Sequence, residues 1–271
     1  MKKMIRNLAW TLLIALMLCV HAAMAEASDP IDLGRQIDLS IVYEDADIPL
    51  KQVTFRLYRI ATVNELGEPT LLPPFSTYPI SLESQSAAQW NALASTLEAY
   101  VLRDNIPATT SGKTNGSGRM RMNLTPGYYL VLGDRHVQDG LVYEVLPAIV
   151  LLPTKSPVTG EWIYEAVLYP KFDSAVAPGE NDFIRRKVLK VWNDEGHERK
   201  RPAQVTVHLL RDGEIYDTVS LTAKNNWRHT WEQLDARHSW RVLEEIPEGY
   251  TVEISREGIT FVVRNTMDGP G

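Results

Sequence analysis

Residues 205–213 read VTVHLLRDG, and the class of fold to expect follows from them. Apolar and polar residues alternate as far as Leu209, which is the pattern of a half-buried strand. Asp212-Gly213 follows, and this dipeptide is a strong short-range signal of a β-hairpin. Residues 214–221 supply a returning strand, so we predict an antiparallel hairpin at this point of the chain.

Strand-like segments continue on both sides of this hairpin. Those on the C-terminal side lie at residues 227–231, 239–244, 250–255 and 259–265. Those on the N-terminal side lie at residues 37–43, 53–60, 119–124, 128–132, 141–152 and 162–168. Short strands at this spacing are typical of β-sandwiches, so we predict an all-β chain with two sandwich domains.

One segment departs from the strand pattern. Between Ser86 and Arg103, apolar residues recur at helical spacing, at Trp90, Leu93, Leu97, Tyr100 and Val101. This spacing predicts an amphipathic helix inserted in the first domain, with Ser86 as its N-cap. Residues 109–117 are rich in Thr, Ser and Gly and predict a loop.

The domain boundaries follow from composition. Residues 173–184 contain Ala, Pro, Gly and acidic residues without periodicity, so we place the linker there, between domains at 26–172 and 185–266. Residues 267–271 end in Gly-Pro-Gly and contain no Leu-Pro-x-Thr-Gly sorting signal. We expect them to begin a further linker in a longer protein.

The N-terminus has the form of a secretory signal peptide at residues 1–25. A positively charged start precedes an apolar run at residues 8–20 and an Ala-x-Ala motif at residues 23–25, so we expect cleavage after Ala25. The alternative is an uncleaved anchor, for which the apolar run is short. Cys19 is the single cysteine and lies in this run, so the mature chain is expected to have no thiol and no disulfide.

Composition excludes several classes of function. The net charge is −6 and no basic block is present, which argues against nucleic-acid binding. The one basic run, Arg199-Lys200-Arg201, is interpreted as a solvated loop. The histidines show no metal-ligand spacing, so we predict no metal and no cofactor. Membrane contact is expected only through the signal peptide or a C-terminal anchor beyond this sequence.

The C-terminal half resembles a known family along most of one domain. The residues that carry the resemblance are KVWND at 190–194, Arg201-Pro202, the hairpin at 205–213, Asn226-Trp227, Trp240-x-Val242-x-Glu244-Glu245, Pro247-x-Gly249-Tyr250 and FVVRNT at 261–266. Their order and spacing, over about residues 186–266, resemble a Cna B-type domain of Gram-positive surface proteins.

This resemblance implies an intramolecular isopeptide bond. Lys190 would be the amine nucleophile, Asn265 the carboxamide that it attacks, and Glu244 the proton shuttle. Burial favours the neutral forms that this chemistry needs. Strand alternation places Lys190 and Glu244 on apolar faces, although a slip of one residue would put Glu245 in place of Glu244. The alternative is that all three are ordinary strand residues.

Residues 37–172 resemble the N-terminal domain of sortase-assembled pilin subunits, which implies an Ig-like or prealbumin-like sandwich. The specific feature is Trp162-x-x-x-Ala166-x-Leu168-Tyr169-Pro170-Lys171. By analogy Lys171 is a possible inter-subunit cross-link, the alternative being a solvated lysine at a strand end. We predict no internal bond in this domain, since its first strand has no Lys and Phe172 stands where an Asn would be needed.

These observations favour a secreted structural or adhesive protein of the bacterial cell wall, a pilin-like subunit or stalk. Its partners would be other pilin subunits, joined by sortase. The alternative is an adhesin module that binds a host matrix protein or glycan through loops 66–78 or 107–119. A secreted hydrolase is a third alternative. We expect no enzyme beyond the single self-modifying reaction.

Overall fold

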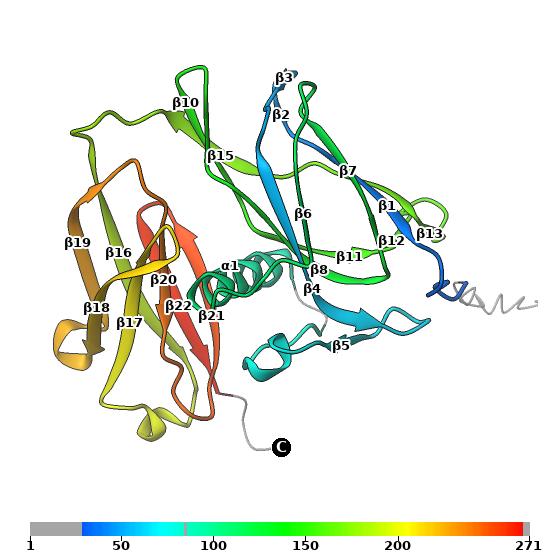
Figure 1. The fold of residues 1–271 in the computed structure, drawn as a ribbon. Coiled ribbons are helices and arrows are strands. Elements are labelled where there is room, and N and C mark those ends of the chain that lie inside the picture. Colours follow the sequence, from blue (N-terminus) through cyan, green and yellow to red (C-terminus); the bar gives the residue numbers. More distant parts are fainter. Residues whose placement is uncertain (1–28, 84–85, 268–271) are drawn as a thin grey trace, which may run out of the picture.

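The computed structural model describes residues 29–83 and 86–267. The predicted signal peptide with Cys19, and residues 268–271, lie outside these ranges. Within the described residues, no helix is both long and apolar enough to cross a membrane. The described chain is built mainly from strands, with one long helix between two β modules (Figure 1). The predicted all-β fold class is therefore confirmed.

The N-terminal module is a sandwich of short sheets. One sheet contains β14 (Glu165–Leu168), β1 (Ile37–Val42) and β7 (Arg119–Leu124) in that order. The second contains β11 (Ala148–Leu152), β8 (Gly127–Gly133), β4 (Thr54–Val63) and β5 (Pro69–Leu71), with β6 (Thr110–Lys113) also beside β4. A third contains β15 (Phe172–Val176), β10 (Leu141–Val145) and β9 (His136–Gln138). Alternate residues of β1 and β4, among them Leu39 and Phe55, are buried in one apolar core.

The remaining elements of this module are short. They are β2 (Glu44–Asp45), β3 (Ile48–Pro49), β12 (Thr154–Lys155), β13 (Trp162–Ile163) and the 3₁₀ turn η1 (Phe75–Thr77). The predicted single strand at 141–152 is interrupted between β10 and β11, where Pro147 has no backbone N–H to donate.

The predicted loop at residues 109–117 is wrong in part, because β6 pairs with β4 from Thr110 to Lys113. Its composition is that of a loop, but a tertiary anchor holds it against the sheet. The buried Thr114 hydroxyl accepts a hydrogen bond from Val53 N (3.0 Å) and donates one to Leu50 O (2.7 Å).

The C-terminal module is a sandwich of two sheets. One contains β19 (Arg228–Asp235), β16 (Phe183–Asn193), β22 (Thr260–Thr266) and β21 (Thr251–Glu257), and the other β18 (Glu214–Thr222), β17 (Gln204–Arg211) and β20 (Trp240–Glu244). The 3₁₀ turns η2 (Glu198–Lys200) and η3 (Ala223–Asn225) lie in its connections. The predicted hairpin joins β17 and β18, and Asp212 and Gly213 have φ of 52° and 97°, as a type I′ turn requires.

The connection between the modules is shorter than the predicted linker. Strand β15 continues to Val176 and pairs with β10, and β16 begins at Phe183. Only residues 177–182 lie between these strands. The exposed side chains of β15 gave no period-2 signal in the sequence, which is why its residues resembled a linker.

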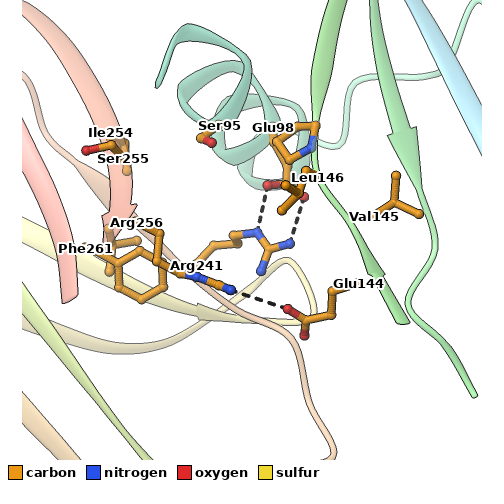
Figure 2. A pocket seen from close by; sticks show the side chains of 12 residues that line it. Ser95, Glu98, Glu144, Val145, Leu146, Arg241, Ile254, Ser255, Arg256 and Phe261 are labelled. Atoms are coloured by element: carbon orange, nitrogen blue, oxygen red, sulfur yellow. Dashed lines mark hydrogen bonds and ion pairs between the residues drawn. The ribbon is translucent and has the colours of Figure 1, made fainter. Parts of the chain in front are cut away.

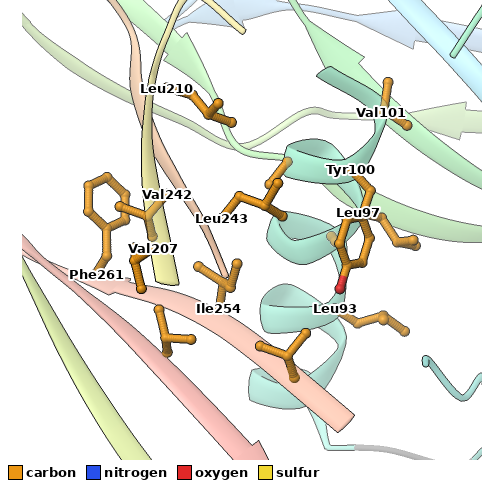
Figure 3. Packing of buried hydrophobic residues seen from close by; sticks show 14 of the residues in the cluster. Leu93, Leu97, Tyr100, Val101, Val207, Leu210, Val242, Leu243, Ile254 and Phe261 are labelled. Carbon is orange, nitrogen blue, oxygen red and sulfur yellow. The ribbon is translucent and has the colours of Figure 1, made fainter. Parts of the chain in front are cut away.

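Helix α1 (Ala87–Arg103) was predicted, and Ser86 caps it as expected. Ser86 and Gln89 form a reciprocal capping box at its start. The helix contacts β8 and β11 of the N-terminal module and also β20 and β21 of the C-terminal module. Leu93 and Leu97 therefore belong to the same buried cluster as Leu243 and Ile254 (Figures 1 and 3). The two modules share one core through this helix.

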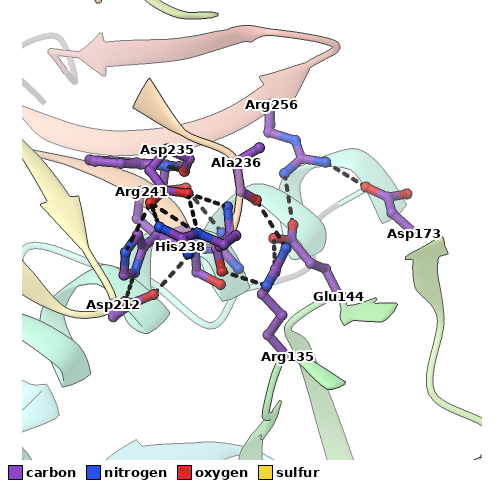
Figure 4. A network of polar contacts seen from close by, with 12 residues as sticks. Arg135, Glu144, Asp173, Asp212, Asp235, Ala236, His238, Arg241 and Arg256 are labelled. Carbon is purple, nitrogen blue, oxygen red and sulfur yellow. Dashed lines mark hydrogen bonds and ion pairs between the residues drawn. The ribbon is translucent and has the colours of Figure 1, made fainter. Parts of the chain in front are cut away.

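Polar contacts reinforce the junction. Arg241 of β20 donates to both carboxylate oxygens of Glu98 on α1, at 2.7 and 3.2 Å, beside a small pocket of about 60 Å³ (Figure 2). A second network lies at the rim (Figure 4). There Arg135 donates to the Ala236 carbonyl, and Arg256 pairs with Glu144 and Asp173.

Candidate cross-linking site

Three strands of the C-terminal module converge on the candidate residues. Strands β16 and β22 are parallel neighbours, with Lys190 opposite Val263 and Trp192 opposite Asn265. Lys190 therefore lies two residues from the partner of Asn265 and on the same face, a diagonal that a long side chain can span. Glu244 is the last residue of β20 and approaches from the facing sheet.

All three candidate residues are buried in the sandwich. The Lys190 Nζ lies 3.7 Å from Glu244 Oε1, and both side chains are 0% exposed. Asn265 is also 0% exposed. The Lys190 ammonium lies 4.0 Å from the centre of the Trp192 ring and donates to the Val191 carbonyl. The structure thus brings together the three residues that the sequence singled out.

The site contains buried polar atoms that are not satisfied. Within residues 29–83 and 86–267, both oxygens of Glu244 and both polar atoms of the Asn265 amide lack a partner at hydrogen-bond geometry. Such groups cost free energy in a folded protein and usually have a functional reason to persist. Here the unsatisfied amide and carboxyl lie beside an amine.

Burial drives the charged pair toward its neutral form. Desolvation lowers the pKa of Lys190, and the nearby Glu244 charge opposes this shift only in part. Desolvation also raises the pKa of Glu244, against the opposing effects of Lys190 and Asn265. A proton moved from the amine to the carboxyl leaves a nucleophilic amine beside a carboxylic acid.

An ion pair between the buried carboxylate of Asp194 and the partly exposed Arg201 adjoins the site, and sequence reasoning missed it. Asp194 is 3% exposed, accepts three hydrogen bonds from Arg201 (3.2, 2.9 and 2.6 Å), and accepts one from the Tyr250 hydroxyl (2.9 Å). Arg201 was expected in a solvated loop, and that interpretation is wrong for this residue. The spacing of Asp194 and Arg201, seven positions apart in a connection, gives no signal of this contact in the sequence. Because Asp194 is already bound by Arg201 and Tyr250, it offsets little of the positive charge of Lys190.

The family model of the Cna protein B-type domain matches part of the chain. Residues 186–266 match a Cna B-type domain. The collagen adhesin of Staphylococcus aureus is 34% identical over 77 residues, which are 26% of this chain and 6% of that protein. The chain thus spans a small fraction of this relative.

Two solved structures were also similar. A single B repeat unit of the collagen-binding surface protein Cna of S. aureus is 18% identical and overlaps 87% of this chain and 99% of its own, with a TM-score of 0.31. The major pilin SpaD of Corynebacterium diphtheriae is 17% identical and overlaps 87% and 65%, with a TM-score of 0.33.

In the C-terminal module the strand register separates Glu244 from its neighbour. The Glu245 side chain is 63% exposed and lies 3.1 Å from Nε2 of His208 on the outer face of the sheet. Glu244 points inward beside Lys190. The sequence left the choice between these two residues open, and the pleat of β20 places Glu244 alone in the core.

Lys171 lies in the other module and away from the Lys190 strand. It is exposed, lies between β14 and β15 directly before Phe172, and accepts a hydrogen bond from Leu146 N at its carbonyl. With Tyr169 and Pro170 it lines an open groove of about 770 Å³ that also includes residues of α1. The next residue, Phe172, packs edge-on against Tyr43 and is part of the apolar core.

No site for a metal was found in the described part of the chain. It contains no cluster of three or more His, Cys, Asp or Glu side chains that could hold an ion. His208 instead pairs with Glu245, and His238 lies between Asp212 and Asp235.

Proposed function

We propose that this protein is a structural component of a bacterial cell surface, a pilin-like subunit or stalk, whose Cna B-type module locks itself with an amide bond between Lys190 and Asn265. The observation that carries the proposal is the buried, 3.7 Å approach of Lys190 to Glu244, beside an unsatisfied Asn265 amide. The family match of residues 186–266 supports the same reading. The reaction acts once, on the chain itself, and not on an external substrate.

The reaction needs only groups present at the site. Glu244 in its acid form polarises the Asn265 carbonyl, and the neutral Lys190 Nζ attacks Cγ. A new Nζ–Cγ bond forms and the Cγ–Nδ2 bond breaks. The amine gives up one proton, which Glu244 relays to the leaving nitrogen, so that ammonia departs and Glu244 ends protonated as it began.

The bond would join the first and last strands of the module. Because β16 and β22 are parallel, tension that enters at the start of β16 and leaves at the end of β22 would pass through the bond. The closed loop from Lys190 to Asn265 would also stabilise the fold by about 4–5 kcal/mol, by the loop-entropy relation for cross-links. No disulfide can serve here if Cys19 leaves with the signal peptide.

Intact-mass spectrometry of the purified protein tests this directly. We expect a mass lower than that of the unreacted mature sequence by one ammonia. Glu244→Gln keeps the shape of the side chain but removes the proton relay, and is expected to fold and to retain the full mass. Glu245→Gln is the matched control and is expected to lose the ammonia. Full mass in the unmodified protein would refute the proposal.

We also propose Lys171 as an acceptor for linkage to a second subunit. Its exposure, its position after a strand end and the open groove beside it would admit an extended peptide. Incubation with a sortase and a second subunit that carries a sorting signal is expected to give a covalent product that Lys171→Arg abolishes. A product that persists in this variant would refute the assignment.

An adhesin remains the second candidate function, because the relative at 34% identity is a collagen adhesin. The full chain would then bind a matrix protein or glycan saturably. Surface plasmon resonance against collagen and a glycan panel tests this, and the absence of saturable binding would leave the structural role alone.

A further inference from the structure

One flank of the Cna B-type module is covered by the other module. Strands β20 and β21 are each the last strand of their sheet, so the sandwich has two strand edges on this flank. Helix α1 packs along both of them (Figure 3). The outward N–H of Ile254 in β21 donates to the Thr96 hydroxyl of the helix at 2.9 Å. The helix thus takes the place that an additional strand could fill.

Tyr100 of this helix lies beside the proposed reaction site. Tyr100 and Glu244 line the same pocket, about 360 Å³ in volume, with Tyr78 and Tyr250 at its other walls. Tyr100 is 1% exposed, and its ring stacks on Tyr78 with centroids 4.3 Å apart. Among the described residues, the hydroxyl of Tyr100 and both oxygens of Glu244 are buried without a hydrogen-bond partner.

We propose that α1 completes the cross-linking site: Tyr100 closes the open flank beside Glu244 and keeps water from the Lys190–Glu244 pair, so the amide bond forms after the two modules have docked. This inference rests on the proposed function and extends it to a residue of the neighbouring module. Tyr100 acts as a positioning residue. It contacts neither the amine nor the amide, and it controls the polarity around the acid that serves them.

The charges around Glu244 show why the seal matters. Lys190 of β16 faces it directly, and Asp194 lies behind the lysine, closed on Arg201. On the helix side, Arg103 lies 5.2 Å over the Tyr100 ring and pairs with Asp104. The charges of Asp194 and Arg103 are thus each neutralised by an ion-pair partner. Glu248 and Tyr250 line the outer part of the pocket. Apart from Lys190 itself, water is therefore the main agent that could stabilise a charged Glu244 if the flank opened.

The test measures the rate of cross-linking in the full chain. Protein purified unfolded and unreacted is refolded at a series of pH values, and the fraction that has lost ammonia is followed by intact-mass spectrometry. The reactive pair has a neutral amine and a protonated acid, so the rate passes through a maximum with pH. Tyr100→Ala is expected to lower this maximum about tenfold, which corresponds to about 1.4 kcal/mol. It is also expected to widen the pH range, as the pKa of Glu244 falls and that of Lys190 rises.

Three further variants make the result decisive. Tyr100→Phe keeps the ring and is expected to react like the unmodified chain. Tyr128→Ala removes a half-buried ring stacked on Trp90 and controls for general weakening of the N-terminal module. Tyr78→Ala removes the ring that stacks on Tyr100. This variant replaces Tyr100→Ala in the test if Tyr100→Ala does not fold. It is then expected to slow the reaction and widen the profile.

Each outcome separates the two proposals. If the unmodified chain never loses ammonia, the proposed function fails. If it does, but Tyr100→Ala, or Tyr78→Ala in its place, has an unchanged rate and pH profile, the role of α1 is overturned and the bond stands. Equal slowing in Tyr128→Ala without a wider profile would also overturn it, since that is general destabilisation.

Discussion

At the scale of single residues, burial removes Lys190 and Glu244 from water. This desolvation favours the neutral amine and the neutral acid that the proposed reaction needs. The Lys190 Nζ and Glu244 Oε1 lie 3.7 Å apart. Burial of two charged groups costs desolvation free energy, which their mutual attraction often fails to offset. The proposed conversion to an amide would remove the charge of the amine permanently. Strand alternation predicts that Lys190 and Glu244 lie on apolar faces, and the resemblance to Cna B-type domains adds Asn265. The choice between Glu244 and Glu245 could not be predicted, since it depends on a register of one residue.

The Asp194–Arg201 pair is the residue-scale feature that the sequence concealed. Its members are seven positions apart in a connection, where spacing does not indicate contact. Arg201 lowers the pKa of Asp194 below its unfolded value, so this stabilisation is complete above about pH 4 and is lost as pH falls through the folded pKa.

Asp194→Asn is expected to destabilise the protein by about 1.5–3 kcal/mol at neutral pH, because the charge-assisted hydrogen bonds with the partly exposed Arg201 are weakened. The loss is expected to shrink as pH falls below about 4, where the unfolded chain takes up the proton, and to vanish below the lowered pKa of Asp194 in the folded chain. Urea unfolding between neutral and acid pH measures this. Asp38→Asn, at a surface pair with Arg121, is the control. An equal effect of the two variants would contradict the role given to Asp194.

At the scale of elements, the hairpin and the capped helix could be predicted because local chemistry specifies them. Asp212-Gly213 and the Ser86–Gln89 box each act over a few residues. Strand β6 could not be predicted, since its Thr, Ser and Gly residues join a sheet only through contacts far along the chain. The second buried face of α1 was also missed, because it consists of weakly apolar residues such as Ala92, Thr96 and Ala99.

Thr96→Val tests how α1 seals the edge of β21. The change keeps the shape of the side chain but leaves the Ile254 N–H buried without an acceptor, at a cost of about 1–3 kcal/mol. Hydrogen exchange at Ile254 is expected to accelerate. Ser95→Ala removes a hydroxyl that bonds only within the helix and is expected to leave this amide unchanged. Unaltered exchange in Thr96→Val would show that the contact does not protect the strand.

At the scale of the whole molecule, two domains separated by a linker were predicted and two modules with a shared core were found. The reason is that contacts of α1 with β20 and β21 link residues about 150 positions apart, such as Thr96 and Ile254. A sequence period describes one face of an element and not the partner that covers it. The modules are therefore expected to unfold together.

Glu98→Gln tests this coupling. It breaks the largely buried pair with Arg241 at the junction and is expected to lower the free energy of unfolding by about 3–5 kcal/mol. The unmodified chain is expected to unfold in a single transition. Glu232→Gln breaks an exposed pair with Arg185 and is expected to cost less than about 1 kcal/mol. Denaturant unfolding measures both. Two separate transitions in the unmodified protein would contradict a shared core.

The most direct test of the covalent lock is peptide mapping of the purified, unmodified protein. After proteolysis, tandem mass spectrometry is expected to find one branched peptide that joins the Lys190 segment to the Asn265 segment and is lighter than the two together by one ammonia. Recovery of both segments as separate linear peptides of full mass would contradict the lock.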